Sequence, residues 1–157
     1  MTDVQKNFFK VAIPAAQACE AATGIPASIT IAQAALESGW LQHIPAGSNN
    51  PFGIKAEHKS DPNSYVEAMT TEYVKGVLVH VEQPFQKYPT LAAAFIDHGR
   101  LLSTAPRYAP AMAEKNDPAE FATQLQKCGY STSPTYAEAL IGLINQYNLH
   151  QYDQKIS

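Results

Sequence analysis

Hydrophobic residues recur three or four positions apart through most of the chain, which is the spacing of amphipathic helices. The pattern predicts helices over residues 4–22, 26–39, 91–102, 108–114, 118–127 and 134–147. Residues typical of helix ends flank these segments: Thr90, Asp117 and Ser133 as N-caps, and Gly24, Gly39 and Gly129 as terminators. Pro14 inside the first segment predicts a kink or a later start.

The period changes from helix to strand between the second and third predicted helices. Valines alternate with other residues over positions 77–81, and Gly76 supplies a turn before them. We expect an antiparallel hairpin over residues 65–85, preceded by a Gly-, Pro- and Asn-rich loop over residues 41–55. The predicted fold is therefore mainly α (α+β), with a helical domain and a small β-hairpin lobe.

The chain of 157 residues has the size of one ordinary domain. It contains no evident linker or repeat, so we expect a single domain over residues 1–157, with a core over about 4–149 and a frayed tail after Leu149. No apolar run is long enough to cross a membrane, and the first ten residues do not form a signal peptide. Membrane insertion is not expected.

Charge and cysteine content exclude several classes of function. The net charge is −3 and Lys and Arg do not cluster, so nucleic acid binding is not expected. The five histidines lack the HExxH spacing of zinc hydrolases, and we expect no metal or cofactor. Cys19 and Cys128 are interpreted as small buried residues rather than as a disulfide, and a nucleophilic role is less favoured still.

The segment from Ser28 to Trp40 carries one acid, Glu37, near the end of an otherwise almost uncharged helix. The alternatives are a capping or salt-bridging acid and a functional one. The helix dipole disfavours an acid near a C-terminus, which favours the functional interpretation. Helical spacing places the segment's residues on two stripes: an apolar one with Ile29, Ala32 and Leu36, and a polar one with Thr30, Gln33 and Glu37.

The predicted hairpin carries a second candidate acid, Glu72. By analogy with lysozyme-like folds, two carboxylates on opposite lobes could flank a glycosidic bond. The strand alternation alone, however, favours an ordinary exposed acid at this position.

Five ordered motifs carry a resemblance to a known family: AQAALESGW, NNPFGIK, TTEY with the following Gly76, PFQKYPTL and GYSTSPTYAEAL. They lie between Ala32 and Leu140, and the resemblance covers about residues 11–149. The chain resembles the bacterial glucosaminidases of glycoside hydrolase family 73, which include flagellar peptidoglycan hydrolases and cell-separation autolysins. The resemblance implies a lysozyme-like fold and a peptidoglycan substrate.

The resemblance also implies roles for individual residues. Glu37 corresponds to the family's general acid, Glu72 to its second acid, and Tyr130 to a tyrosine that lines the cleft near the general acid. Substrate contacts are expected from Asn50, Phe52, Gly53 and Tyr136, whereas Trp40 is interpreted as a packing residue. Two positions depart from the family: Ser133 replaces an aspartate but can still cap the final helix, and Gln86 replaces an arginine, with Lys87 adjacent to it.

The chemistry of such a site is specific. Glu37 needs a raised pKa to protonate a leaving oxygen, and Leu36, Trp40 and Phe52 could supply the desolvation. Glu72 would stay ionised, and would activate water or stabilise positive charge on the sugar. Alternatively, the acetamido group of the substrate would act as the nucleophile, and Glu72 would be dispensable.

The predicted function is that of a monomeric endo-β-N-acetylglucosaminidase, which cleaves the β-1,4 bond between N-acetylglucosamine and N-acetylmuramic acid in peptidoglycan glycan strands. A lytic transglycosylase or an N-acetylmuramidase on the same fold is the nearest alternative. A non-catalytic peptidoglycan-binding module is the alternative from another class.

Delivery is predicted from what the sequence lacks. Without a signal peptide or a wall-anchoring repeat, the protein would reach the periplasm through a secretion apparatus, such as a type VI system, or after host lysis. The effector interpretation, an antibacterial toxin, is slightly favoured over a phage lysin, and it implies a cognate immunity protein that occludes the cleft. A fragment of a larger enzyme is a further alternative.

Overall fold

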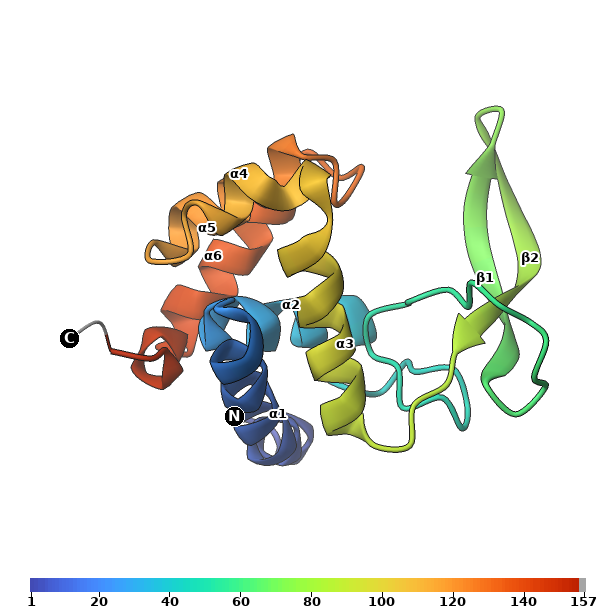
Figure 1. The fold of residues 1–157 in the computed structure, drawn as a ribbon, viewed down its shortest axis with the longest axis horizontal. Coiled ribbons are helices and arrows are strands. Elements are labelled where there is room, and N and C mark those ends of the chain that lie inside the picture. The colour runs from blue at the N-terminus through green and yellow to red at the C-terminus, as the bar shows by residue number, and fades with distance from the viewer. Residues whose placement is uncertain (156–157) are drawn as a thin grey trace.

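A computed structural model of the chain describes residues 1–155, apart from the side chain of Tyr73. Six α-helices form one body, and a two-stranded hairpin stands to the side of it, as Figure 1 shows. This arrangement confirms the predicted mainly helical fold with a small β lobe. The elements in chain order are α1 (Asp3–Thr23), α2 (Ala27–Ser38), β1 (Tyr65–Val74), β2 (Val77–Gln86), α3 (Leu91–Thr104), the 3-10 helix η1 (Pro106–Tyr108), α4 (Ala109–Met112), α5 (Pro118–Lys127), α6 (Tyr136–Gln146) and the 3-10 helix η2 (Leu149–Tyr152).

Helix α2 lies in the centre of the helical body and packs against α1, α5, α6 and η2. Ten of its 12 residues are buried, on every side of the helix, because small alanines let the neighbouring helices approach closely. Only the last turn reaches solvent, through Leu36 and Glu37. Leu36 is thus the exposed end of the predicted apolar stripe, and the earlier residues of both predicted stripes of α2 are buried.

Most helix ends lie close to the predicted positions. Thr2 and Gln5 form a reciprocal capping box that starts α1, which then runs through Pro14 without a later start. The last helix differs, because it begins at Tyr136 and not at Pro134. Ser133 does not cap it: its Oγ accepts a hydrogen bond from the amide of Thr135 (3.3 Å), which makes a turn before the helix begins.

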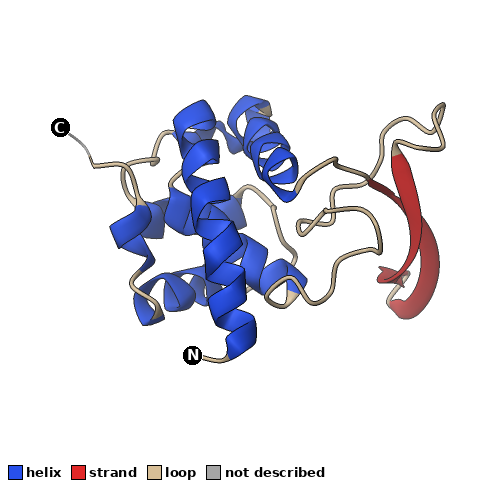
Figure 2. Cartoon of the chain, turned by 90° about the horizontal axis from the view of Figure 1, so that it is seen from below, coloured by secondary structure: helices blue, strands red, loops and turns tan. Residues whose placement is uncertain are grey.

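The hairpin is the predicted one, and Figure 2 shows how it projects from the helical body. Val74 pairs with Val77 across a two-residue turn, and Lys75 and Gly76 both have positive φ (51° and 79°). Two such residues give the turn the right-handed twist that tight hairpins need. A bridge between Lys55 and Phe85 joins the preceding loop to β2.

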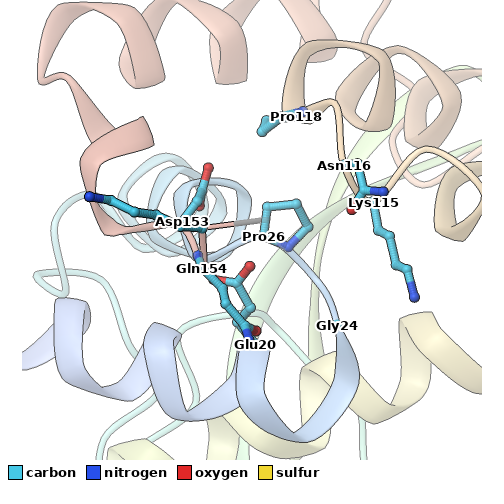
Figure 3. A pocket seen from close by; sticks show the side chains of 9 residues that line it. Glu20, Gly24, Pro26, Lys115, Asn116, Pro118, Asp153 and Gln154 are labelled. Atoms are coloured by element: carbon cyan, nitrogen blue, oxygen red, sulfur yellow. The ribbon is translucent and has the colours of Figure 1, made fainter. Parts of the chain in front are cut away.

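Residues 149–153 pack against α2, within the segment where a frayed tail was expected. Leu149 is buried, and Asp153 accepts hydrogen bonds from the amide (2.6 Å) and the hydroxyl (2.8 Å) of Ser28. The physical reason is that α2 starts after Pro26 without a side-chain cap of its own, so its first amides need acceptors from elsewhere. Figure 3 shows Asp153 and Glu20 beside this helix start, around a cavity of about 330 Å³.

Both cysteines are free, so the disulfide alternative is not realised. Cys19 is fully buried, as predicted, whereas Cys128 is only partly buried. Within residues 1–155, no helix has the length and apolar character that a membrane crossing requires.

Gly99 of α3 has no room for a side chain against α1. A Cβ atom at this position would overlap Sγ of buried Cys19 and lie 3.0 Å from Cγ2 of Thr23. We expect Gly99→Ala to lower the free energy of unfolding by about 1–3 kcal/mol in urea denaturation, because overpacking outweighs the usual helix preference for alanine. Gly142→Ala, in open space on α6, is the matched control and should be neutral or stabilising. A stabilised Gly99→Ala variant would contradict this prediction.

Candidate active site

Three elements converge on the carboxyl group of Glu37. The hydroxyl of Tyr130, which follows α5, donates to both carboxyl oxygens, at 2.9 Å from Oε1 and 3.1 Å from Oε2. The hydroxyl of Tyr136, the first residue of α6, donates to Oε2 at 3.0 Å. Two of the predicted site residues therefore contact the predicted general acid directly.

The environment of Glu37 favours its protonated form. Burial raises the pKa of Glu37 to about 8, and the hydrogen bonds from Tyr130 and Tyr136 act in the opposite direction because they stabilise the carboxylate. Glu37 is nevertheless partly exposed to solvent, and water next to it works against the increase in its pKa that burial causes. At neutral pH the group is thus able to give up a proton, which is what a general acid must do.

The groups that surround Glu37 differ in part from the predicted ones. Trp40 packs instead against Phe8, Phe9 and Tyr147, which confirms its interpretation as a packing residue. Leu36 is 42% exposed, so it desolvates little. Two tyrosines provide the immediate contacts with Glu37, and Phe52 lines a cavity beside it.

Two surface cavities meet at Glu37 and share no other residue. The first, of about 320 Å³, lies between Glu37, the loop before the hairpin and the strands, and its walls include Gly53, Thr70 and Phe85. The second, of about 310 Å³, is lined largely by aromatic and aliphatic side chains, with Tyr108 and Tyr130 among them. The acid therefore stands at the junction of two hollows, one toward the β lobe and one toward the helices.

Asn50 is a scaffold residue of the loop before the hairpin. It is 1% exposed, and its Nδ2 donates to the carbonyls of Ile54 (2.8 Å) and Gln86 (3.0 Å). Its Oδ1 accepts from the amides of Phe52 (3.3 Å) and Ile54 (3.2 Å). The amide has no hydrogen-bonding capacity left for a substrate, so Asn50 shapes the cavity wall, and direct binding stays a prediction.

Phe52 and Gly53 form the turn that follows Asn50. Phe52 is mostly buried and stacks on the ring of His98, with centroids 3.9 Å apart and planes 2° apart. Gly53 has φ +64° and lines the cavity, and a Cβ atom there would meet no other atom within 4 Å. The backbone at Gly53 is thus open to a ligand, while Phe52 supports the wall.

Glu72 does not line either cavity at Glu37. Alternation along β1 places it on the same face as Ala68 and Thr70, which do line the first cavity, but nearer the hairpin tip. Its Oε1 accepts from Nζ of Lys55 at 2.6 Å. Lys55 ends the NNPFGIK motif, but the motif alone does not indicate that it pairs with Glu72.

Two buried residues behind the site, Gln33 and His98, were not assigned a role from the sequence. Oε1 of Gln33 lies 3.0 Å from Nε2 of His98, and Nε2 of Gln33 donates to the hydroxyl of Tyr136 at 3.1 Å. Gln33 stands on the same polar stripe as Glu37, which is the signal that could have found it. His98 lies among apolar residues of α3, and only the tertiary contact reveals it.

A helix-borne acid with a raised pKa, at the junction of hollows between a helical and a β lobe, is the arrangement of a lysozyme-like glycoside hydrolase. Within residues 1–155 no group of three or more His, Cys, Asp and Glu side chains is placed to hold a metal ion. Residues 13–149 match the model of the family Glucosaminidase, described as mannosyl-glycoprotein endo-beta-N-acetylglucosaminidase, and the chain belongs to this family. The family resemblance inferred from the five motifs is thereby confirmed.

Solved and curated relatives agree with this assignment. The catalytic domain of the autolysin Auto from Listeria monocytogenes is 30% identical and superposes with a TM-score of 0.86 over 98% of this chain and 89% of that chain. "Peptidoglycan hydrolase FlgJ" of Vibrio parahaemolyticus is 33% identical over 88% of this chain and 46% of its own length. "Exo-glucosaminidase LytG" of Bacillus subtilis is 36% identical over 81% of this chain and 46% of its own length. The chain thus spans about half the length of these two relatives.

Proposed function

We propose that this glycoside hydrolase acts on the glycan strands of peptidoglycan, as an endo-β-N-acetylglucosaminidase that cleaves the β-1,4 bond between N-acetylglucosamine and N-acetylmuramic acid. The observation that carries the proposal is the carboxyl group of Glu37, held by Tyr130 and Tyr136 at the junction of two cavities. Two relatives, a peptidoglycan hydrolase and an exo-glucosaminidase by name, support the choice of substrate.

The chemistry follows from the contacts of Glu37. Glu37 gives its proton to the glycosidic oxygen while the bond from that oxygen to the anomeric carbon breaks, and the bonding electrons stay on the oxygen. Glu37 is then a carboxylate, and the hydroxyls of Tyr130 and Tyr136 stabilise its new charge. The tyrosines thus lower the free energy of the state that proton transfer creates.

The two cavities favour cleavage inside a strand. An enzyme that removes terminal sugars closes one end of its site, whereas here both hollows beside Glu37 are open to the surface and have separate walls. A glycan strand can therefore lie across the acid with sugars on either side. This distinguishes the proposal from the exo mode in the name of the Bacillus subtilis relative.

Mass spectrometry of digested peptidoglycan tests the bond that is cleaved. After borohydride reduction, the proposal requires N-acetylglucosamine at the new reducing ends, in fragments longer than one sugar. Anhydro-muramic ends would indicate a lytic transglycosylase, and reducing muramic acid would indicate a muramidase. Binding to peptidoglycan without any new ends would establish the non-catalytic module instead.

The pH profile of hydrolysis should follow the protonation of Glu37. Because burial raises the pKa of this acid to about 8, the protonated form persists through neutral pH and is lost above it. We expect kcat/KM on solubilised glycan strands to fall on the alkaline side, with an apparent pKa well above that of an ordinary glutamate. A decline that begins near pH 5 would contradict the assignment of Glu37 as the acid.

Glu72 is proposed as the second acid, paired with Nζ of Lys55 and able to activate water from the β lobe. We expect Glu72→Gln to lower kcat by about 100-fold, as loss of a general base does. Lys55→Met is the matched control: it keeps the carboxylate and should have a much smaller effect. Full activity of Glu72→Gln would instead assign the nucleophile to the acetamido group of the substrate.

Three further points stay predictions: delivery as an antibacterial effector, action in the periplasm, and an immunity protein that covers the cleft. Expression in the periplasm of a sensitive host, with and without the neighbouring small open reading frame, tests them together. Protection by that product supports the effector, and equal killing in both strains counts against an immunity partner.

A further inference from the structure

A chain of buried hydrogen bonds runs from α3 through α2 to the catalytic carboxyl group. Nε2 of His98 contacts Oε1 of Gln33 (3.0 Å), Nε2 of Gln33 contacts the hydroxyl of Tyr136 (3.1 Å), and that hydroxyl contacts Oε2 of Glu37 (3.0 Å). Gln33 is completely buried and His98 is 3% exposed, so water cannot substitute for these partners.

The direction of each bond depends on the next one, because Tyr136 has a single proton. With its amide nitrogen toward Tyr136, Gln33 donates and leaves that proton for Glu37. With its carbonyl toward Tyr136, Gln33 would compete with Glu37 for the proton. The first arrangement puts the carbonyl of Gln33 against His98, and two acceptors cannot face each other. Nε2 of His98 must therefore carry a hydrogen.

We propose that His98, as its neutral Nε2–H tautomer, is a positioning residue that locks the amide of Gln33 and so directs the proton of Tyr136 to Oε2 of Glu37. The inference rests on the proposed role of Glu37 as general acid. Oε2 then lies within hydrogen-bonding distance of both tyrosine hydroxyls, whereas Oε1 lies within that distance of Tyr130 alone. Oε1 is thus the oxygen that carries the catalytic proton and delivers it to the glycosidic oxygen.

The surroundings of His98 hold its ring in place. Phe52 stacks on one face with the two planes 2° apart, and the edge of Tyr130 lies toward it, with centroids 6.0 Å apart. Burial lowers the pKa of His98 to about 3, which keeps the ring neutral at every pH where hydrolysis would be measured. The predicted site residue Phe52 thereby helps to orient the ring of His98, and it affects Glu37 only through that ring.

The titratable groups around Glu37 limit how a pH profile can be interpreted. Tyr130 and Tyr136 contact Glu37 directly, and their pKa values are raised, mainly by burial. His43 lines the first cavity, and His98 and Tyr108 line the second. Variants at His98 and Gln33 change none of the tyrosines or His43, so a shifted alkaline limb reports on Glu37.

The decisive variants are His98→Phe and the double variant His98→Phe/Gln33→Met. Phenylalanine keeps the stack on Phe52 but removes the donor, so the carbonyl of Gln33 turns toward the only remaining donor, Tyr136. We expect kcat to fall about tenfold with KM unchanged, and the alkaline limb to move to higher pH, because Glu37 loses a donor that stabilises its carboxylate. Methionine has no carbonyl, so the double variant should recover kcat and the wild-type limb.

Each outcome separates positioning from a merely structural role. An unchanged profile in His98→Phe, or a double variant at least as impaired as the single one, overturns the inference. The ¹⁵N shifts of histidine-labelled wild-type protein provide a test that needs no variant to fold: the His98 signals must show hydrogen on Nε2, and hydrogen on Nδ1 overturns the proposal. Failure of the wild type to cleave peptidoglycan would overturn the proposed function and leave the tautomer result standing.

Discussion

Glu37→Gln is expected to reduce peptidoglycan hydrolysis at least about 1,000-fold, because glutamine matches the size of glutamate but cannot act as an acid. Its carbonyl can still accept hydrogen bonds from Tyr130 and Tyr136, so the site should keep its shape. Release of reducing ends from purified peptidoglycan measures the loss, and binding to insoluble peptidoglycan should be retained. Activity within tenfold of the wild type would contradict the assignment of Glu37 as the general acid.

The same variant has an expected effect on stability. The folded-state pKa of Glu37 lies near 8, above its ordinary value of 4.5, so between these pH values the folded protein binds more protons than the unfolded chain. The contribution of Glu37 to stability therefore decreases as the pH rises through this window. Glutamine does not titrate, so the melting temperature of Glu37→Gln relative to the wild type should rise from pH 5 to pH 8. A constant difference would contradict the raised pKa.

The hydroxyls of Tyr130 and Tyr136 are expected to have the second largest effect. Each donates to the carboxylate that proton transfer leaves behind, and loss of one such donor in an active site costs about 100-fold in kcat. Tyr130→Phe is the cleaner change. In Tyr136→Phe the buried amide nitrogen of Gln33 also loses its acceptor, which costs about 1–3 kcal/mol of stability.

The direction of the pH effect checks this explanation. Both hydroxyls hold the pKa of Glu37 down, so either variant should move the alkaline limb of kcat/KM to higher pH while kcat falls. Trp40→Phe, at a packing position away from the carboxyl group, is the control and should leave the limb in place. A limb that stays fixed in Tyr130→Phe would show that its hydroxyl does not stabilise the carboxylate.

Local pattern was sufficient for the elements of the fold and for the identity of the acid. Helical spacing, strand alternation and turn residues such as Gly76 act between near neighbours in the chain, so they can be interpreted without knowing the fold. Glu37 could be predicted because an acid near the end of an almost uncharged helix is unusual, and the ordered motifs added Tyr130. The predicted start of the last helix is wrong by two residues, because the side chain of Ser133 makes a turn there instead of a cap.

Contacts between distant parts of the chain could not be predicted from the local spacing of hydrophobic, polar and turn residues. The cap that Asp153 supplies to Ser28, the pairing of Lys55 with Glu72 and the contact of Gln33 with His98 each join different elements. Such contacts depend on how the helices and the hairpin pack. No residue type near Leu149 indicates the contacts that residues 149–153 make with α2.

The sequence by itself therefore determined most helix bounds, the hairpin and the family, and it made Glu37 at the end of α2 the candidate acid. The tertiary structure decided the environment of that acid, because the pKa of Glu37 depends on burial and on hydroxyl groups that approach from α6 and from the turn after α5. It also shows that the side chains of Gln33 and Asn50 form hydrogen bonds that support the walls of the site. A side chain's type is set by the sequence, whereas its protonation and orientation are set by neighbours that only folding brings within hydrogen-bonding distance.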